Sequence, residues 1–424
     1  MRNLLALALG LTLGLAGTST AFATPTAPVQ VDVARSQAAL DQLLLRYDRT
    51  PAGAARTALA EQIDKVAAQK YATVSRLFWH TDLDAAEAEA ARTKKPILAL
   101  RMLGRLDEDL SCANSRFFRA TLYANKAVSA YLKNNFVLYW SSEREVPKVT
   151  IDFGDGRTIE STTTGNSAHY ILDATGAVLD VLPGLYSPRA FTAELAKSLA
   201  QAKAVARAPS HERRQKIIAY HQAKLAEISD AAAKLSVHTL RGQRVSAEMA
   251  VSLAQRATMS KAYVEVPQLR QITRAELAAI DEDEVATWAS FGAQLWPAEI
   301  NEARAMQVAL PRGELPPIQV FDEQSLALID TLHGDAPATT KAQMLERLAL
   351  SVRADSALNQ LRLRTQIAAH LAKGTTDFTE VNDFIYANVF HTPKSDPWLG
   401  LHTRTVFTGL PGDGVTMPAK AAQR

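Results

Sequence analysis

Residues 95–187 constrain the fold of this 424-residue chain more than any other stretch, because almost all of its strand-like segments lie there. Four short apolar runs have the length and flanks expected of buried strands: 96–103, 135–140, 168–172 and 177–182. Between the first two runs, Phe117, Leu122, Val128 and Leu132 recur at helical spacing, with a break near residues 123–126. The segment therefore predicts a mixed α/β fold.

Cys112 is the only cysteine in the chain, and it falls where the helical segment between the first two runs is expected to begin. Backbone N–H groups at a helix start stabilise a thiolate, and so does a nearby cation such as Arg116. The acidic residues Asp107, Glu108 and Asp109 act in the opposite direction. Free cysteine is also among the most buried residue types. The residues alone leave open both a reactive thiol and an inert, half-buried one.

The order of strand, cysteine at a helix start, bent helix and strand resembles a thioredoxin-like domain over residues 78–200. Phe78-Trp79 and the alanine-rich stretch after it match the family's lead-in, and Cys112-Ala-Asn-Ser115 stands at the position of its Cys-x-x-Cys motif. Ser115 replaces the second cysteine, and Ser167 stands where the family has a cis-proline. The resemblance implies an α/β fold with a thioredoxin-like domain.

The resemblance also implies thiol–disulfide chemistry at Cys112, with a protein or a small-molecule thiol or disulfide as partner. Without a second thiol, an outside thiol must resolve the mixed disulfide. In a thioredoxin geometry Asn114, Ser115 and Ser167 would donate hydrogen bonds to the thiolate, and His169 would carry a proton. These residue types are also typical of caps, turns and cores. The rival hypothesis is a binding or scaffold module that keeps the fold without the chemistry.

Residues 1–23 have the layout of a secretory signal peptide, with a charged start, an apolar run from Leu4 to Ala16 and the cleavage motif Ala21-Phe-Ala23. The run is shorter than the roughly 20 apolar residues that cross a bilayer, although an uncleaved anchor is the alternative. No later stretch is apolar enough to span. We therefore expect a mature chain without a transmembrane segment, exported to the periplasm or secreted.

The rest of the sequence predicts helices around the strand-bearing part. Residues 24–77 contain two amphipathic stretches that form a helical hairpin. Strand signals nearly vanish beyond residue 207, so the sequence predicts a thioredoxin-like domain over 78–207 and an all-α domain over 208–390. Residues 391–424 are rich in proline and glycine and predict an extended arm.

Two features inside the thioredoxin-like part are also predicted. Residues 149–160 alternate in type around Gly154 and Gly156, which is typical of a β-hairpin inserted into the domain. Ser187 and Pro188 supply an N-cap and a first helical residue for a closing helix, whose buried stripe begins at Phe191.

Composition and motifs argue against several classes of function. The 47 basic and 44 acidic residues give a net charge of +3, whereas phosphate binding needs clustered, uncompensated cations, so no nucleic acid is expected. A single cysteine cannot form an internal disulfide. The sequence has no Cys-x-x-Cys, no His-Glu-x-x-His and no phosphate-binding glycine loop, so neither a metal nor a cofactor is expected.

Overall fold

The computed structural model describes residues 36–163, 165–235, 288–297, 320–399, 401 and 409–417. The described elements belong to one compact unit, Arg35–Arg424. The predicted signal peptide lies outside the described residues, and so do residues 236–287 and 298–319 of the predicted helical domain. Among the described residues, no helix combines the length and the apolar character needed to cross a membrane.

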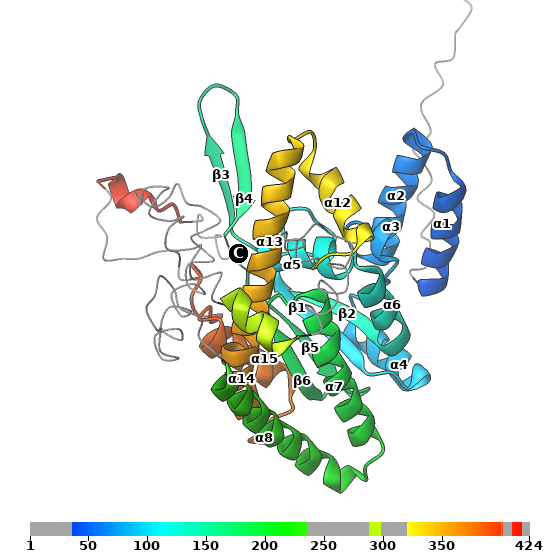
Figure 1. Cartoon of the computed structure of the whole chain (residues 1–424), viewed down its shortest axis with the longest axis vertical. Coiled ribbons are helices and arrows are strands. Elements are labelled where there is room, and N and C mark those ends of the chain that lie inside the picture. Colours follow the sequence, from blue (N-terminus) through cyan, green and yellow to red (C-terminus); the bar gives the residue numbers. More distant parts are fainter. Residues whose placement is uncertain are drawn as a thin grey trace, which may run out of the picture. The chain divides into compact units, whose positions relative to one another are not determined.

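A four-stranded mixed sheet organises the fold (Figure 1). Its strands are β1 (Ile97–Leu103), β2 (Val137–Arg144), β5 (Ser167–Leu172) and β6 (Val178–Pro183), in the order β2-β1-β5-β6. Strand β1 runs parallel to β2 and antiparallel to β5, and β5 runs antiparallel to β6. The strands coincide with the four predicted runs. Their apolar residues are continuous because helices cover both faces of the sheet.

One face of the sheet packs against the helices that follow Cys112 and against the closing helix. These elements are α5 (Ala113–Phe117), the π-helical turn η1 (Phe118–Leu122), α6 (Lys126–Asn135) and α7 (Pro188–Ala206). Leu98, Leu100 and Leu138 share a core cluster on this side with Phe118 and Phe191. Alternate strand residues supply this face, as the two-residue period of a strand requires.

The helix after Cys112 is interrupted, as the sequence predicts. After the π-helical turn, Asn125 accepts hydrogen bonds from the backbone N–H groups of Ala127 (3.1 Å) and Val128 (3.0 Å), and α6 starts there. Asn125 therefore acts as the N-cap that begins the second part of the bent helix.

The other face of the sheet is covered mainly by helices from the second half of the chain. These elements are α4 (Leu83–Thr93), α14 (Arg364–Leu371), α15 (Phe378–Phe384) and the π-helical turn η4 (Ile385–Val389). Ile97, Ala99 and Tyr170 share a core cluster on this side with Ile367 and Ile385. The strand-bearing part and the helices beyond residue 208 therefore share one hydrophobic core.

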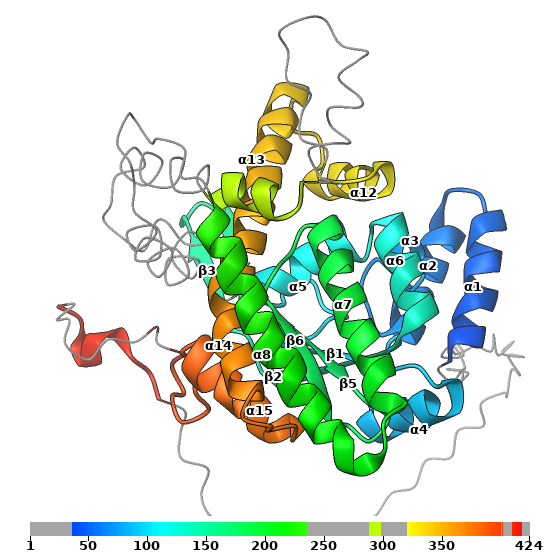
Figure 2. The ribbon, with the colours of Figure 1, turned by 60° about the horizontal axis from the view of Figure 1, so that its bottom comes forward.

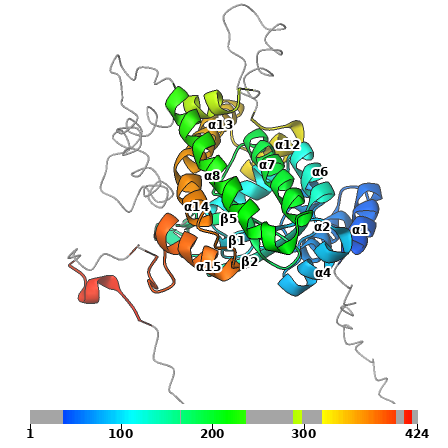
Figure 3. The same cartoon turned by 90° about the horizontal axis from the view of Figure 1, so that it is seen from below.

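The other described helices between residues 208 and 390 also reach the first face, because Ile217, Ile329 and Val352 share its core cluster. They are α8 (Ser210–Lys234), a helical segment at residues 288–295, α12 (Glu323–His333), α13 (Ala338–Leu358) and the π-helical turn η3 (Asn359–Leu363), which leads into α14. Helix α8 packs along α14 and beside α7, as Figure 2 and Figure 3 show. The regular elements that the structure describes in this range are all helices.

The predicted N-terminal helical hairpin is present as α1 (Gln37–Arg49) and α2 (Ala54–Ala67), followed by the short α3 (Ala72–Ser75). Leu40, Leu44 and Ile63 form the core of this hairpin together with Phe78. Ser36 caps α1 by accepting a hydrogen bond from the Ala39 N–H at 3.1 Å.

The predicted β-hairpin is present as β3 (Lys148–Asp152) and β4 (Thr158–Thr162), which pair only with each other among the described strands. In Figure 1 the hairpin extends away from the four-stranded sheet. In the predicted C-terminal arm, the described residues include a short 3-10 helix, η5 (Pro411–Gly414).

Candidate functional site

Strand β1 and the loop after it place Cys112 at the first turn of α5. The Cys112 N–H donates to the Leu103 carbonyl at 3.2 Å, which anchors the cysteine to the end of β1. Helix α5 has only 5 residues before it passes into the π-helical turn. The cysteine therefore occupies the predicted position, between a core strand and a bent helix.

The Cys112 side chain is fully buried, with an exposed fraction of 0%. Burial raises the pKa of the Cys112 thiol, and hydrogen bonds from Ser115 and the charge of Arg116 only partly offset that effect. Of the two alternatives that the residues leave open, the structure fits the buried thiol and not a thiolate favoured by the helix start. The reason is that loss of solvation outweighs the contribution of a short first turn.

The three polar residues after the cysteine are hydrogen-bonded within the fold. Ser115 donates from Oγ to the Cys112 carbonyl at 2.9 Å and also contacts Ser111 Oγ. Asn114 donates from Nδ2 to the Gly165 carbonyl. The resemblance places the partner-binding loop at residues 165–167, and the structure brings that loop against α5.

Arg116 and its neighbour Thr162 attach the inserted hairpin to the cysteine loop. The Arg116 guanidinium donates to the Ser111 carbonyl (3.3 Å) and to Thr162 Oγ1 (3.2 Å). Thr162 Oγ1 in turn donates to the Ser111 carbonyl at 2.8 Å. Arg116 therefore contributes to the site mainly by fixing the base of β4 beside Cys112.

The start of the hairpin, just before β3, also packs against the loop that precedes Cys112. Gly104 has a φ of +72°, and a Cβ there would lie only 3.0 Å from Val146 Cγ1, just before β3. Only glycine combines this backbone conformation with so close an approach. The loop before Cys112 and the hairpin root are thus packed together.

Ser167 and His169, the two candidates on β5, are both fully buried. His169 Nε2 pairs with the Tyr123 hydroxyl at 2.7 Å, and its ring packs against Phe118 and Phe191. Burial lowers the pKa of His169 to about 3, so the ring is neutral near neutral pH. Ser167 Oγ and His169 Nδ1 have no hydrogen-bond partner among the described residues. Among the described residues, Ser167 Oγ and His169 Nδ1 therefore form no hydrogen bond with the thiol, and His169 belongs to an aromatic core.

A second concentration of ionisable groups lies between β6, α7, α8 and α14, where sequence reasoning named no residue. Arg364 donates to Asp180 Oδ2 and to Glu194 Oε2, each at 2.6 Å. All three side chains are at most 2% exposed. Ser198 (2.6 Å) and Tyr220 (2.8 Å) also donate to Asp180 Oδ2. The arrangement joins strand β6 to helices from both halves of the chain.

The acidic and basic side chains of this cluster stabilise one another in their ionised forms. Burial by itself would raise the pKa of Asp180, but Arg364 and the neighbouring donors outweigh it and hold that pKa at about 2. Burial likewise opposes ionisation of Glu194, and Arg364 and Lys224 lower its pKa. The two carboxylates raise the pKa of Arg364 against the effect of burial. The cluster is therefore a buried ion-pair network that depends on its central guanidinium.

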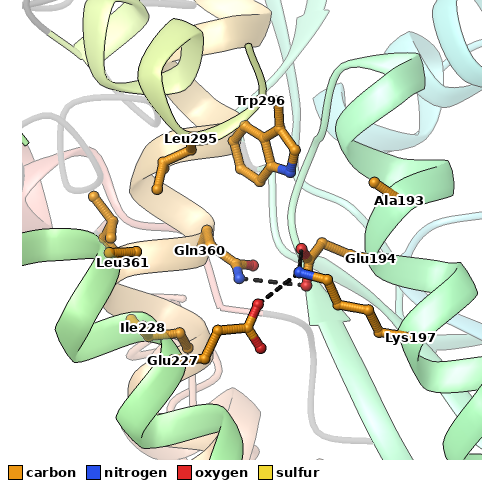
Figure 4. A pocket seen from close by; sticks show the side chains of 10 residues that line it. Ala193, Glu194, Lys197, Glu227, Ile228, Leu295, Trp296, Gln360 and Leu361 are labelled. Atoms are coloured by element: carbon orange, nitrogen blue, oxygen red, sulfur yellow. Dashed lines mark hydrogen bonds and ion pairs between the residues drawn. The ribbon is translucent and has the colours of Figure 1, made fainter. Parts of the chain in front are cut away.

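A pocket of about 120 Å³ adjoins this network. Figure 4 shows Glu194, Lys197 and Glu227 meeting on one side, with Trp296 facing them across the pocket. Lys197 bridges Glu194 (2.7 Å) and Glu227 (2.6 Å), and Gln360 donates to Glu194 at 3.3 Å. Because these polar groups are paired with one another, their evident role is to hold α7, α8 and η3 together.

Two residues in the sequence could have indicated the second cluster. Asp180 interrupts the apolar run of 177–182, and a carboxylate inside a buried strand needs a charged partner. Glu194 stands beside Leu195 on the buried stripe of the closing helix, which is the same kind of signal. The identity of the partner, Arg364, could not be deduced because it lies 184 residues away in sequence.

Among the described residues, no group of three or more His, Cys, Asp or Glu side chains is arranged to hold a metal ion. Comparison with family models, with curated proteins and with solved structures gives no match to this chain.

Proposed function

We propose that this chain is an exported, thioredoxin-like binding or scaffold module in which Cys112 packs the core and takes no part in thiol–disulfide exchange. The burial of Cys112 carries this proposal, together with the rise in thiol pKa that burial causes. Exchange requires a thiolate in contact with a disulfide sulfur. A buried thiol that stays protonated near neutral pH meets neither requirement.

The order of elements supports the thioredoxin-like part of the proposal. Strand β1, the bent helix from Cys112, strand β2, the antiparallel pair β5 and β6 and the closing helix α7 follow the order that the resemblance implies. The contact between Asn114 and Gly165 also fits that resemblance, because it brings the loop before β5 beside the cysteine turn.

The neighbours of Cys112 support the binding or scaffold role over chemistry. Asn114 and Arg116 direct their donors to oxygens of the fold, and Ser115 bonds to the Cys112 carbonyl as well as to the thiol. The base of the inserted hairpin packs against the loop before the cysteine. Side chains that would hydrogen-bond a thiolate in an exchange site thus also stabilise the loop around Cys112 in this fold.

We expect iodoacetamide to alkylate Cys112 in the native protein on the order of 100-fold more slowly than in the urea-unfolded chain, because the buried thiol reacts only after local opening. Across pH, the midpoint of native alkylation should lie above the ordinary cysteine value of about 8.5. The measurement is the rate of mass increase by intact-protein mass spectrometry, with nonreducing gels run in parallel.

The matched control is the double variant Cys112→Ala/Ser210→Cys, which moves the only thiol to the exposed first residue of α8. It should react at nearly the same rate folded and unfolded. Fast native alkylation of Cys112 with a midpoint below about 8.5, or partner adducts that disappear in Cys112→Ala, would replace this proposal with monothiol exchange.

The exported location is part of the same proposal and rests on the sequence of residues 1–23. We expect the protein recovered from an exporting bacterial host to begin at Thr24, because signal peptidase cleaves after the small-residue motif that ends at Ala23. The measurement is the intact mass of the purified chain. Recovery of the chain with residues 1–23 still attached would contradict cleavage and favour an uncleaved anchor.

A further inference from the structure

The β3–β4 hairpin is a two-stranded sheet with open backbone edges. Neither strand pairs with a third strand among the described residues. Isolated two-stranded hairpins are marginally stable in water, and a sheet with an apolar face normally needs three or more strands. Val149 and Ile151 of β3 are half-buried, and Ile159, opposite Ile151, is 46% exposed. The hairpin thus has an apolar face that lacks further strands.

Two hydrogen bonds at its ends fix which backbone groups of β3 point to the open edge. The Thr163 N–H donates to the Pro147 carbonyl, and the Phe153 N–H donates to the Arg157 carbonyl. Hydrogen-bonded and non-hydrogen-bonded pairs alternate along an antiparallel ladder. The backbone groups of Lys148, Thr150 and Asp152 therefore point away from β4.

We propose that β3 pairs antiparallel with β3 of a second copy of this chain, about a two-fold axis at Thr150. In this register Lys148 lies opposite Asp152 of the other copy, and Thr150 lies opposite itself. The three residues whose backbone groups face outward are those that this register brings into hydrogen-bonded pairs. Opposite charges and paired threonines are favourable cross-strand neighbours. The sequence Lys-Val-Thr-Ile-Asp of β3 is thus complementary to its own reverse.

The same register completes the apolar face. Val149 lies opposite Ile151 of the other copy in a non-hydrogen-bonded pair, where side chains approach most closely. The resulting sheet of four strands places Ile159 of each copy at the flank of this stripe. Such a two-fold interface uses the same patch on both partners, as is usual for homodimers.

Strand β4 does not offer an equivalent edge. Its outward residues are centred on Glu160, which two-fold pairing would place opposite itself, and like charges facing each other are destabilising. The side chain of Thr162 is fully buried and bonded to the cysteine loop. Pairing of two copies is therefore favoured through β3 over β4. Because one strand pair buries only a small area, the dimer should be weak and its population should depend on protein concentration.

Two single charge reversals and their mixture test the proposal in the full mature chain. Lys148→Glu places Glu opposite Asp152 at both ends of the interface, and Asp152→Lys places Lys opposite Lys148. Each variant should weaken the dimer about 10-fold or more, measured by sedimentation over a concentration series. An equimolar mixture of the two variants should dimerise like the unaltered chain, because every pair is again of opposite charge.

A covalent test uses the residue on the axis. Facing residues of a hydrogen-bonded pair have Cα atoms about 5.5 Å apart, a spacing that a disulfide spans. In a Cys112→Ala background, Thr150→Cys should form an intermolecular disulfide under mild oxidation. The matched control, Glu160→Cys on the neighbouring strand, should crosslink much less.

The proposal is overturned if the unaltered chain stays monomeric at the highest concentration reached. It is also overturned if the mixture dimerises no better than either variant, or if the two cysteine variants crosslink equally. Dimers that survive both charge reversals would place the interface elsewhere. Pairing of β3 with an extended segment of a different protein would instead give a monomeric chain and no crosslinking at Thr150→Cys.

Discussion

Arg364→Met is expected to lower the free energy of unfolding by about 3–5 kcal/mol, the range for removing one partner of a buried ion pair. The substitution leaves Asp180 and Glu194 buried without their shared guanidinium. That loss is a large fraction of the 5–15 kcal/mol that ordinary domains retain. Urea unfolding followed by circular dichroism measures it.

Two comparison variants separate the lost charge from the lost packing. Arg46→Met, at an exposed position on α1, should change stability by less than about 0.5 kcal/mol. Adding Asp180→Asn and Glu194→Gln to Arg364→Met should recover part of the loss, because the uncompensated charges are removed. If the triple variant is no more stable than Arg364→Met alone, repulsion and desolvation of the carboxylates are not the cause.

The stability lost in Arg364→Met should also depend on pH, because it comes from an ion pair. With a pKa of about 2 in the folded state, Asp180 contributes stability that is present above its unfolded value, about 3.9, and is lost as pH falls toward 2. Without Arg364, the pKa of Asp180 should rise because burial is opposed by fewer charges, so this contribution to stability should be smaller and be lost at a higher pH. The difference in stability between the two proteins should be largest near neutral pH and narrow below about pH 4.

A fragment that ends at residue 208 is expected not to fold on its own. The sequence predicts a domain boundary there, but the second face of the sheet is covered by Leu363, Ile367, Leu371, Val381, Ile385 and Val389, all from beyond it. Removing six buried apolar side chains forfeits on the order of 10 kcal/mol, as much as the net stability of a typical domain. Asp180 and Glu194 would lose Arg364 as well.

The test is to express residues 24–208 alone, record the near-ultraviolet circular dichroism of the fragment and follow its unfolding in urea. We expect no cooperative transition from the fragment alone. Co-expression with residues 209–424 should restore a folded complex, because the missing layer is supplied in trans. A fragment that unfolds cooperatively by itself would support the boundary near residue 208.

The sequence by itself determined the local elements. Period-two and apolar patterns located all four strands of the main sheet and the inserted hairpin, because strand propensity and turn glycines are local signals. It also located the bent helix after Cys112, whose restart depends on a nearby side chain, Asn125. The thioredoxin-like order of elements, which remains a proposal, came from the same local information.

The tertiary structure alone decided the environment of each candidate residue. Residues close in sequence leave both a thiolate and an inert thiol open at Cys112, and burial in the core raises the thiol pKa. The partner of Asp180 comes from α14, and the second face of the sheet is covered by helices that the sequence assigned to a separate domain. Solvation and ion pairing depend on which distant segments meet, and local periodicity carries no information about that.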